Sequence, residues 1–305
     1  MVTASLIPPL GRRVAPASAT AAQALAHILP RLALQARQVS AQVSFGIHGR
    51  RRPGPGETFW QFRPFMSGEP VDRIDWRRSA RDDKLYVRER EWEAASTYWL
   101  WIDLSESMNY VSSLALQAKR ERAIVLGLAL ADLLVRSGER VGLLGVTRPV
   151  VSRAIISRMA DAMAISHERH GEDLPEAAPP GPRDRLILIG DFIMPLPDLE
   201  ARFRALTSRG AGGLAVQIRD PAEAAFPFGG ETEFFAPGTA GRWRVGEAAD
   251  MRSAYRERMA AHEDALRRIC LQRGWRFFAH TTDRPASEGM LSIAMMLTAG
   301  QGNAA

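Results

Sequence analysis

The feature that most constrains the fold is a regular alternation of apolar, strand-like runs and helical patterns that begins at Tyr98. Buried strands are predicted at 98–102, 141–146, 186–190, 214–218 and 275–279. Helical spacing of apolar residues is found at 117–136, 153–166, 199–209, 250–273 and 288–297. The strands are apolar throughout, as strands covered on both faces must be. The alternation therefore predicts an α/β fold with a doubly wound, mostly parallel sheet and helices on both faces.

The chain before this domain follows a different pattern. We divide the sequence into an N-terminal tail and helix at 1–43, a β-rich elaboration at 44–97, the α/β domain at 98–298 and a tail at 299–305. Pro30 is expected to kink or break the first helix because proline removes a backbone donor. We expect the β-rich elaboration to pack on the sheet.

An arginine-rich stretch within this elaboration has two interpretations. Arg73, Asp75, Trp76 and Arg81 alternate acids and arginines around an aromatic side chain. The planar guanidinium matches a carboxylate, so these residues would form paired bridges inside the fold. Alternatively, they present a face that binds a partner.

Composition restricts the class of protein. The formal net charge is +6, which suits an acidic partner surface, although it comes almost entirely from arginine. The single cysteine, Cys270, excludes an internal disulfide and is expected to be a buried small hydrophobe in a reducing compartment. The longest apolar run, 123–135, is too short to span a bilayer. With no targeting segment apparent, we expect a cytoplasmic protein.

Polar side chains follow two of the predicted strands. Asp103 and Asp191 each end a strand, and hydroxyls follow the first at Ser105 and Ser107. Because the carboxyl ends of parallel strands share one edge of a sheet, these oxygens are expected to converge. Carboxylate and hydroxyl oxygens are ligands for a hard cation, so the sequence predicts a site for Mg²⁺ or Mn²⁺. A serine that caps the following helix is the alternative, and capping and coordination can coexist.

A series of motifs along the chain resembles one bacterial family. The motifs are Gly46–Gly49, Phe65–Arg81, Asp103–Met108, Gly190–Phe192, Asp220–Glu223 with Phe226–Phe228, and Thr282–Pro285. In this order they look like the family called domain of unknown function 58, whose members are similar to von Willebrand factor A domains. The resemblance covers nearly the whole chain from about residue 40. It implies a von Willebrand A-like fold.

The same resemblance carries over a metal-ion-dependent adhesion site. Asp103, Ser105, Ser107 and Asp191 match its positions; in von Willebrand A domains the hydroxyls bind the ion directly and the aspartates often act through water. The pattern also contains a threonine on a loop between the two aspartates, and the corresponding stretch, 170–174, has none. Glu172 or Asp173 would substitute for it, while Thr147 is a poorer candidate.

The family resemblance also implies a role. Genes of this family typically lie beside one for a MoxR-type AAA+ ATPase, which implies an adaptor that works with that ATPase on a client protein, in assembly or activation. We therefore expect a non-enzymatic interaction module in which an open coordination position on the ion accepts an acidic side chain from a partner.

Two other functions fit parts of the sequence. A metal-dependent hydrolase would use Asp103 as its nucleophile, but such sites commonly have a second acid two residues later, where Ser105 stands. A serine nucleophile would need a base. Five histidines are available, but none has a recognisable elbow motif: His48, His167, His170, His262 and His280. Nucleic acid would bind through 50–52 and 77–81, but the aromatic platform for single strands is missing, so we do not expect this partner.

Overall fold

The computed structural model describes residues 17–43, 53–81, 84–91, 96–169, 180–182, 184–235 and 241–300. The chain separates into two compact units, one made of Met1–Ile47 and Ser96–Ala305 and the other of His48–Ala95. The first helix therefore belongs to the larger unit, together with the α/β domain.

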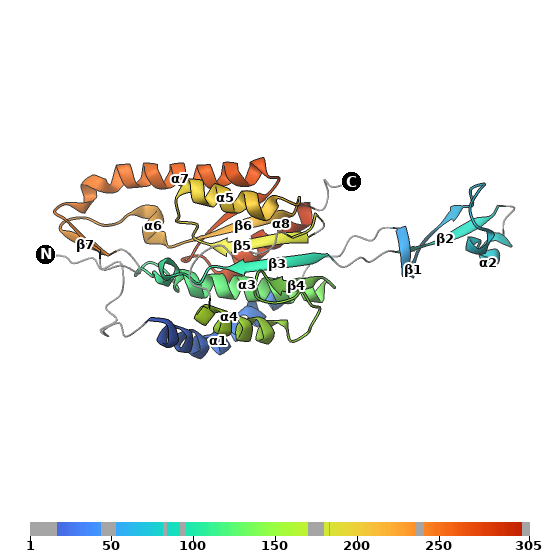
Figure 1. The fold of residues 1–305 in the computed structure, drawn as a ribbon, viewed down its shortest axis with the longest axis horizontal. Coiled ribbons are helices and arrows are strands. Elements are labelled where there is room, and N and C mark those ends of the chain that lie inside the picture. The colour runs from blue at the N-terminus through green and yellow to red at the C-terminus, as the bar shows by residue number, and fades with distance from the viewer. Residues whose placement is uncertain are drawn as a thin grey trace. The chain divides into compact units, whose positions relative to one another are not determined.

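A parallel sheet forms the centre of the larger unit (Figure 1). Within the described residues it has five strands in the order β4-β3-β5-β6-β9, and every neighbouring pair is parallel. The strands are β3 (Thr97–Ile102), β4 (Arg140–Leu143), β5 (Asp184–Gly190), β6 (Gly212–Arg219) and β9 (Arg276–Thr281). The predicted α/β fold, consistent with a von Willebrand A-like winding, is confirmed. Since β3 and β5 are neighbours, the loops that follow them leave the same edge side by side.

Helices cover both faces of this sheet (Figure 1). On one face lie α3 (Lys119–Arg136), α4 (Ile155–Arg169) and α8 (Ala286–Gly300), and α1 (Ala17–Gln42) packs on these helices. The other face packs against α5 (Leu196–Thr207) and α7 (Arg252–Gln272). Successive side chains of a strand point to opposite faces, and on β5 Ile187 and Ile189 enter the first core while Leu186 and Leu188 enter the second.

Helix α3 is the most deeply buried helix in this arrangement. All its residues from Arg122 to Val135 are buried, because α3 lies between the sheet and α1 and α4. Gly127 permits this close approach, since a Cβ there would lie 2.4 Å from the Cδ1 of Ile102 on β3. The depth of α3 fixes where its first residues meet the carboxyl edge of the sheet.

Short elements complete the larger unit. They are η2 (Glu106–Asn109), α6 (Pro221–Ala225), β7 (Thr232–Phe235), β8 (Arg242–Val245) and η3 (Ala248–Met251). β7 and β8 form an antiparallel pair. The rings of Phe226, Phe228 and Phe234 contact one another, with centroids 5.2 to 5.9 Å apart.

The smaller unit is built on an antiparallel pair, β1 (Pro53–Pro64) and β2 (Tyr86–Glu91). The connection between them contains η1 (Val71–Arg73) and α2 (Trp76–Ser79). The carboxylate of Asp75 caps α2 by accepting a hydrogen bond from the Arg78 N–H at 3.0 Å.

Two local predictions were wrong: a break of the first helix at Pro30, and the length of strand β4. Helix α1 continues through Pro30, because the buried side chains Leu25, Leu29 and Leu32 hold one face across it while the proline itself is exposed. Strand β4 ends at Leu143 rather than at Val146, because the chain turns at Gly145, whose φ is +74°. Among the described helices, none is both long and apolar enough to cross a bilayer.

Candidate functional site at the carboxyl edge of the sheet

The register of β3 and β5 brings the two predicted aspartates together. Ile102 pairs with Ile189, and the Asp103 N–H extends the ladder by donating to the carbonyl oxygen of Ile189 at 2.8 Å. Asp103 therefore stands beside Gly190, where a Cβ would lie 2.8 Å from the Asp103 Cβ and 2.9 Å from its Oδ2. The absence of a side chain at 190 leaves room for the Asp103 carboxylate next to Asp191.

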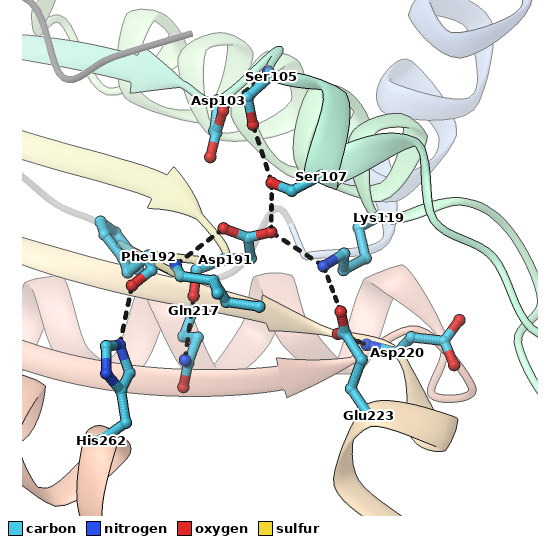
Figure 2. Close-up of polar contacts among 11 residues, drawn as sticks. Asp103, Ser105, Ser107, Lys119, Asp191, Phe192, Gln217, Asp220, Glu223 and His262 are labelled. Carbon is cyan, nitrogen blue, oxygen red and sulfur yellow. Dashed lines mark hydrogen bonds and ion pairs between the residues drawn. The ribbon is translucent and has the colours of Figure 1, made fainter. Parts of the chain in front are cut away.

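A chain of hydrogen bonds joins the four predicted ligand residues (Figure 2). The Ser105 N–H donates to Asp103 Oδ1 at 2.9 Å, and the Ser105 and Ser107 hydroxyl oxygens are 3.0 Å apart. Ser107 Oγ donates to Asp191 Oδ2 at 2.7 Å. The Ser105 side chain makes no capping hydrogen bond to η2, so capping does not account for this serine. We call these four residues the oxygen cluster.

The two carboxylates of the oxygen cluster are buried, and its two serines are not. Only 6 % of Asp103 and 3 % of Asp191 is exposed, whereas both serines are partly exposed. Access from solvent is therefore through the hydroxyl side.

Sequence reasoning missed the cation that lies against this cluster. The Lys119 ammonium is 2.9 Å from Asp191 Oδ2 and 2.6 Å from Glu223 Oε1, and its side chain is 1 % exposed (Figure 2). Lys119 is the first residue of α3, a position where the helix dipole disfavours a positive charge. The two carboxylates compensate for that position and for the burial.

Glu223 is itself held in place by a capping box on α6. Its Oε2 accepts a hydrogen bond from the Asp220 N–H at 2.9 Å, and Asp220 Oδ1 accepts one from Ala222. Lys119 thus joins α3, the loop after β5 and α6. A signal for it existed in the sequence: Lys119 and Lys84 are the only lysines among 40 basic residues, and Glu223 lies in a motif to which we had assigned no role.

The two aspartates of this site differ in how their pKa values are shifted. Burial, followed by the nearby Asp191 carboxylate, raises the pKa of Asp103 to about 6. Burial would raise the pKa of Asp191 too, but Lys119 and the Ile193 N–H outweigh it and the pKa lies below its usual range. Burial likewise lowers the pKa of Lys119, yet Asp191 and Glu223 outweigh it and the pKa is raised. Asp191 and Lys119 are therefore a charged pair, whereas Asp103 forms no salt bridge with any of the described residues.

The residues present fit a hard divalent ion that retains several waters. Two carboxylates and two hydroxyls supply only oxygen atoms, although one carboxylate is already paired with Lys119. Within the described residues, no group of three or more His, Cys, Asp or Glu side chains is placed to hold a metal. Thr147 is engaged in the turn after β4, where its Oγ1 accepts from the Leu143 N–H at 2.9 Å. Glu172 and Asp173 lie outside the described residues.

A groove opens beside the loop that carries Asp191. Phe192 has a left-handed backbone (φ 54°), and its carbonyl oxygen is 2.9 Å from the His262 Nε2 on α7 (Figure 2). This turn leaves Ile193 half exposed at the edge of a groove of about 550 Å³ between the loop and α7. The groove is lined by apolar side chains and by two guanidiniums on α7, those of Arg258 and Arg268.

A second buried cation lies one turn further along α3. Arg122 Nη1 is 2.7 Å from His280 Nε2 and also donates to the carbonyl oxygen of Arg284, while Nη2 donates to that of Thr282 at 3.3 Å. Burial and then Arg122 lower the pKa of His280 to about 4. This cluster connects α3 to the loop after β9.

The remaining candidate residues are placed elsewhere. Arg73, Asp75, Trp76 and Arg81 lie in the smaller unit, and Trp76 is 60 % exposed. Cys270 is buried, and burial raises the pKa of its thiol to about 12, so it is no nucleophile.

The histidines considered as bases also have other partners. Among the contacts of the described residues, His262 and His280 bond to other groups, as given above, and neither bonds to Ser105 or Ser107. His48 and His170 lie outside the described residues, as does the side chain of His167.

Comparison with known proteins places this chain in a family. Residues 61–265 match the family described as "Protein of unknown function DUF58". "Uncharacterized protein Mb1516" of Mycobacterium bovis and "Uncharacterized protein Rv1480" of Mycobacterium tuberculosis are each 26 % identical over 224 residues, covering 67 % of this chain and 68 % of the relative. No solved structure matches the chain. Because the matched range spans most of the sequence and contains the oxygen cluster, Lys119 and Glu223, the chain belongs to the DUF58 family.

Proposed function

We propose that the protein is a non-enzymatic interaction adaptor that binds its partner at the carboxyl edge of the larger unit's sheet. The observation that carries this proposal is the hydrogen-bonded oxygen cluster, which two neighbouring strands build at one edge. Buried carboxylates that approach one another are unfavourable unless a positive charge lies between them or a partner supplies one. At Asp103 the nearby charge of Lys119 does not outweigh burial and the Asp191 carboxylate, so its pKa stays raised.

In this proposal a divalent ion, Mg²⁺ or Mn²⁺, is held by Asp103, Ser105, Ser107 and Asp191. When bound, the ion supplies an electrophilic position that accepts a carboxylate from the partner. The protein's own residues orient the oxygen atoms, and the two carboxylates are buried from bulk solvent. The partly exposed serines provide the side from which a partner reaches the site.

The groove beside Asp191 supports a partner with acidic character. Arg258 and Arg268 line the groove together with apolar side chains such as Ile193 and Met259. An acidic segment with apolar side chains would complement both features. Following the family resemblance, we propose a MoxR-type AAA+ ATPase as this partner, with a client protein handled by the pair in the cytoplasm.

A binding measurement with purified proteins tests the proposal. A MoxR-type ATPase from the same organism is titrated with the full chain, in Mn²⁺ and in EDTA. Asp103→Asn is expected to weaken binding about tenfold or more, since it removes a charged ligand without changing shape. The matched control is Asp161→Asn, an exposed aspartate on α4. Equal affinity of Asp103→Asn and the unaltered chain would refute the proposed site.

A further inference from the structure

The ammonium of Lys119 contacts Asp191, a carboxylate that an ion at the oxygen cluster would also use. It donates to Asp191 Oδ2, the same oxygen atom that accepts the Ser107 hydroxyl. Asp191 Oδ1 accepts from the Ile193 N–H at 3.0 Å, so Oδ2 accepts two hydrogen bonds and Oδ1 accepts one. A divalent ion that draws on Asp191 must therefore share it with Lys119.

The two carboxylates that contact Lys119 come from separate elements: Asp191 from the loop after β5 and Glu223 from α6. Glu223 is fixed by its own bond to the Asp220 N–H, independently of the oxygen cluster. The ammonium can consequently lose its contact with Asp191 and keep its contact with Glu223.

We propose that Lys119 is a tethered cation that holds the oxygen cluster together without an ion and competes with a divalent ion for Asp191. Glu223 is the positioning residue that retains the ammonium when the ion takes Asp191. This inference deepens the proposed function and rests on it, because it concerns how the same site is loaded. In this proposal the affinity for the ion depends on Lys119 as well as on the number of oxygen ligands.

The test is calorimetric titration of the full chain with MnCl₂, accompanied by melting curves in EDTA and in Mn²⁺. Lys119→Gln is expected to bind Mn²⁺ about tenfold or more tightly than the unaltered chain, because the competing charge is gone. Its melting temperature is expected to fall in EDTA and to recover in Mn²⁺. The matched control is Arg120→Gln, which removes a positive charge from the next residue of α3 and is expected to change affinity much less.

A second variant decides the matter if Lys119→Gln fails to fold. Glu223→Gln leaves the ammonium with Asp191 as its one carboxylate partner, so Mn²⁺ should bind more weakly. Glu106→Gln removes the same charge from η2 without contacting Lys119 and serves as its control. Unchanged affinity in Glu223→Gln relative to Glu106→Gln would overturn the inference.

The outcomes separate this inference from the proposed function. Mn²⁺ binding by Lys119→Gln that is no tighter than that of the unaltered chain overturns the competition, as does a failure of every variant to bind the ion. In either case partner binding that is still lost in Asp103→Asn leaves the adaptor function standing. Partner binding that is unaffected in Asp103→Asn removes the adaptor site, whatever the calorimetry gives.

Discussion

Helix α3 carries two buried cations one turn apart, and their surroundings differ. Lys119 and Arg122 are each 1 % exposed. The acceptors of Lys119 are two carboxylates, Asp191 and Glu223. Those of Arg122 are an imidazole and two main-chain carbonyls from the loop after β9. The first arrangement balances charge among three elements, whereas the second fixes one loop to the helix by hydrogen bonds.

Because of this difference, a bound ion would change the contacts of Lys119 but not those of Arg122. A charged pair changes strength when a further ion arrives or when a carboxylate is protonated. Carbonyl acceptors have no such response, because they do not titrate. The carboxyl edge of the sheet therefore has one half that responds to a divalent ion, around Lys119, and one half that does not, around Arg122, where the imidazole of His280 is the one acceptor that titrates.

The largest effect is expected from Lys119→Met. This change leaves Asp191 and Glu223 buried without their cation, and we expect it to destabilise the fold by about 3–5 kcal/mol. Urea denaturation at neutral pH in EDTA measures the loss. A change below about 1 kcal/mol would mean that the ion pair contributes no more than a surface bridge does.

The next effect concerns pH and belongs to the Arg122 half. The pKa of His280 falls from 6.5 to about 4 on folding. Its contribution to stability is thus present above pH 6.5 and is lost as the pH falls through 4, a loss of about 3 kcal/mol. Asp103, with its pKa raised to about 6, acts in the opposite direction over the same range. The free energy of unfolding is measured against pH for the unaltered chain and for His280→Gln, and the difference between the two curves gives the contribution of the histidine. Parallel curves would show that His280 makes no pH-dependent contribution.

Arg122→Met is expected to have a smaller effect than Lys119→Met. It removes hydrogen bonds to the carbonyl oxygens of Thr282 and Arg284, which corresponds to about 1–3 kcal/mol. No carboxylate is left unpaired, so Mn²⁺ should restore nothing. Recovery of the stability of Arg122→Met in Mn²⁺ would show that Arg122, like Lys119, is coupled to the ion site.

The smallest effect has the opposite sign. Asp103→Asn removes a buried charge whose pKa is raised, and we expect it to stabilise the fold by about 1–2 kcal/mol at pH 7. Thermal melting in EDTA measures the gain. Destabilisation of similar size would indicate that the Asp103 charge is already compensated in the folded protein.

The fold and the oxygen cluster could be predicted from the sequence because an apolar strand is recognised from a short stretch of neighbouring residues. Apolar runs located β3 and β5, and the rule that parallel strands share an edge brought Asp103 and Asp191 together. Gly190 adds a local signal that we had not used, since the approach of Asp103 requires a residue without a Cβ there.

Lys119 could not be predicted in this way. Its partners are 72 and 104 residues away along the chain, and no periodic pattern relates these positions. The loop between η2 and α3 is irregular, so the start of the helix at Lys119 depends on tertiary packing. The same limit applies to Pro30, because packing of α1 against α3 and α4 overrides the local preference of proline.

The most direct test of the central claim is a double-mutant cycle on Lys119 and Asp191. Unfolding free energies in EDTA are compared for Lys119→Met, Asp191→Asn, the double variant and the unaltered chain. The double variant is expected to be destabilised by at least about 1 kcal/mol less than the sum of the single variants, because each single substitution leaves the other partner buried without its opposite charge. Destabilisations that simply add would contradict it, and Lys119 would then have no part in holding the oxygen cluster.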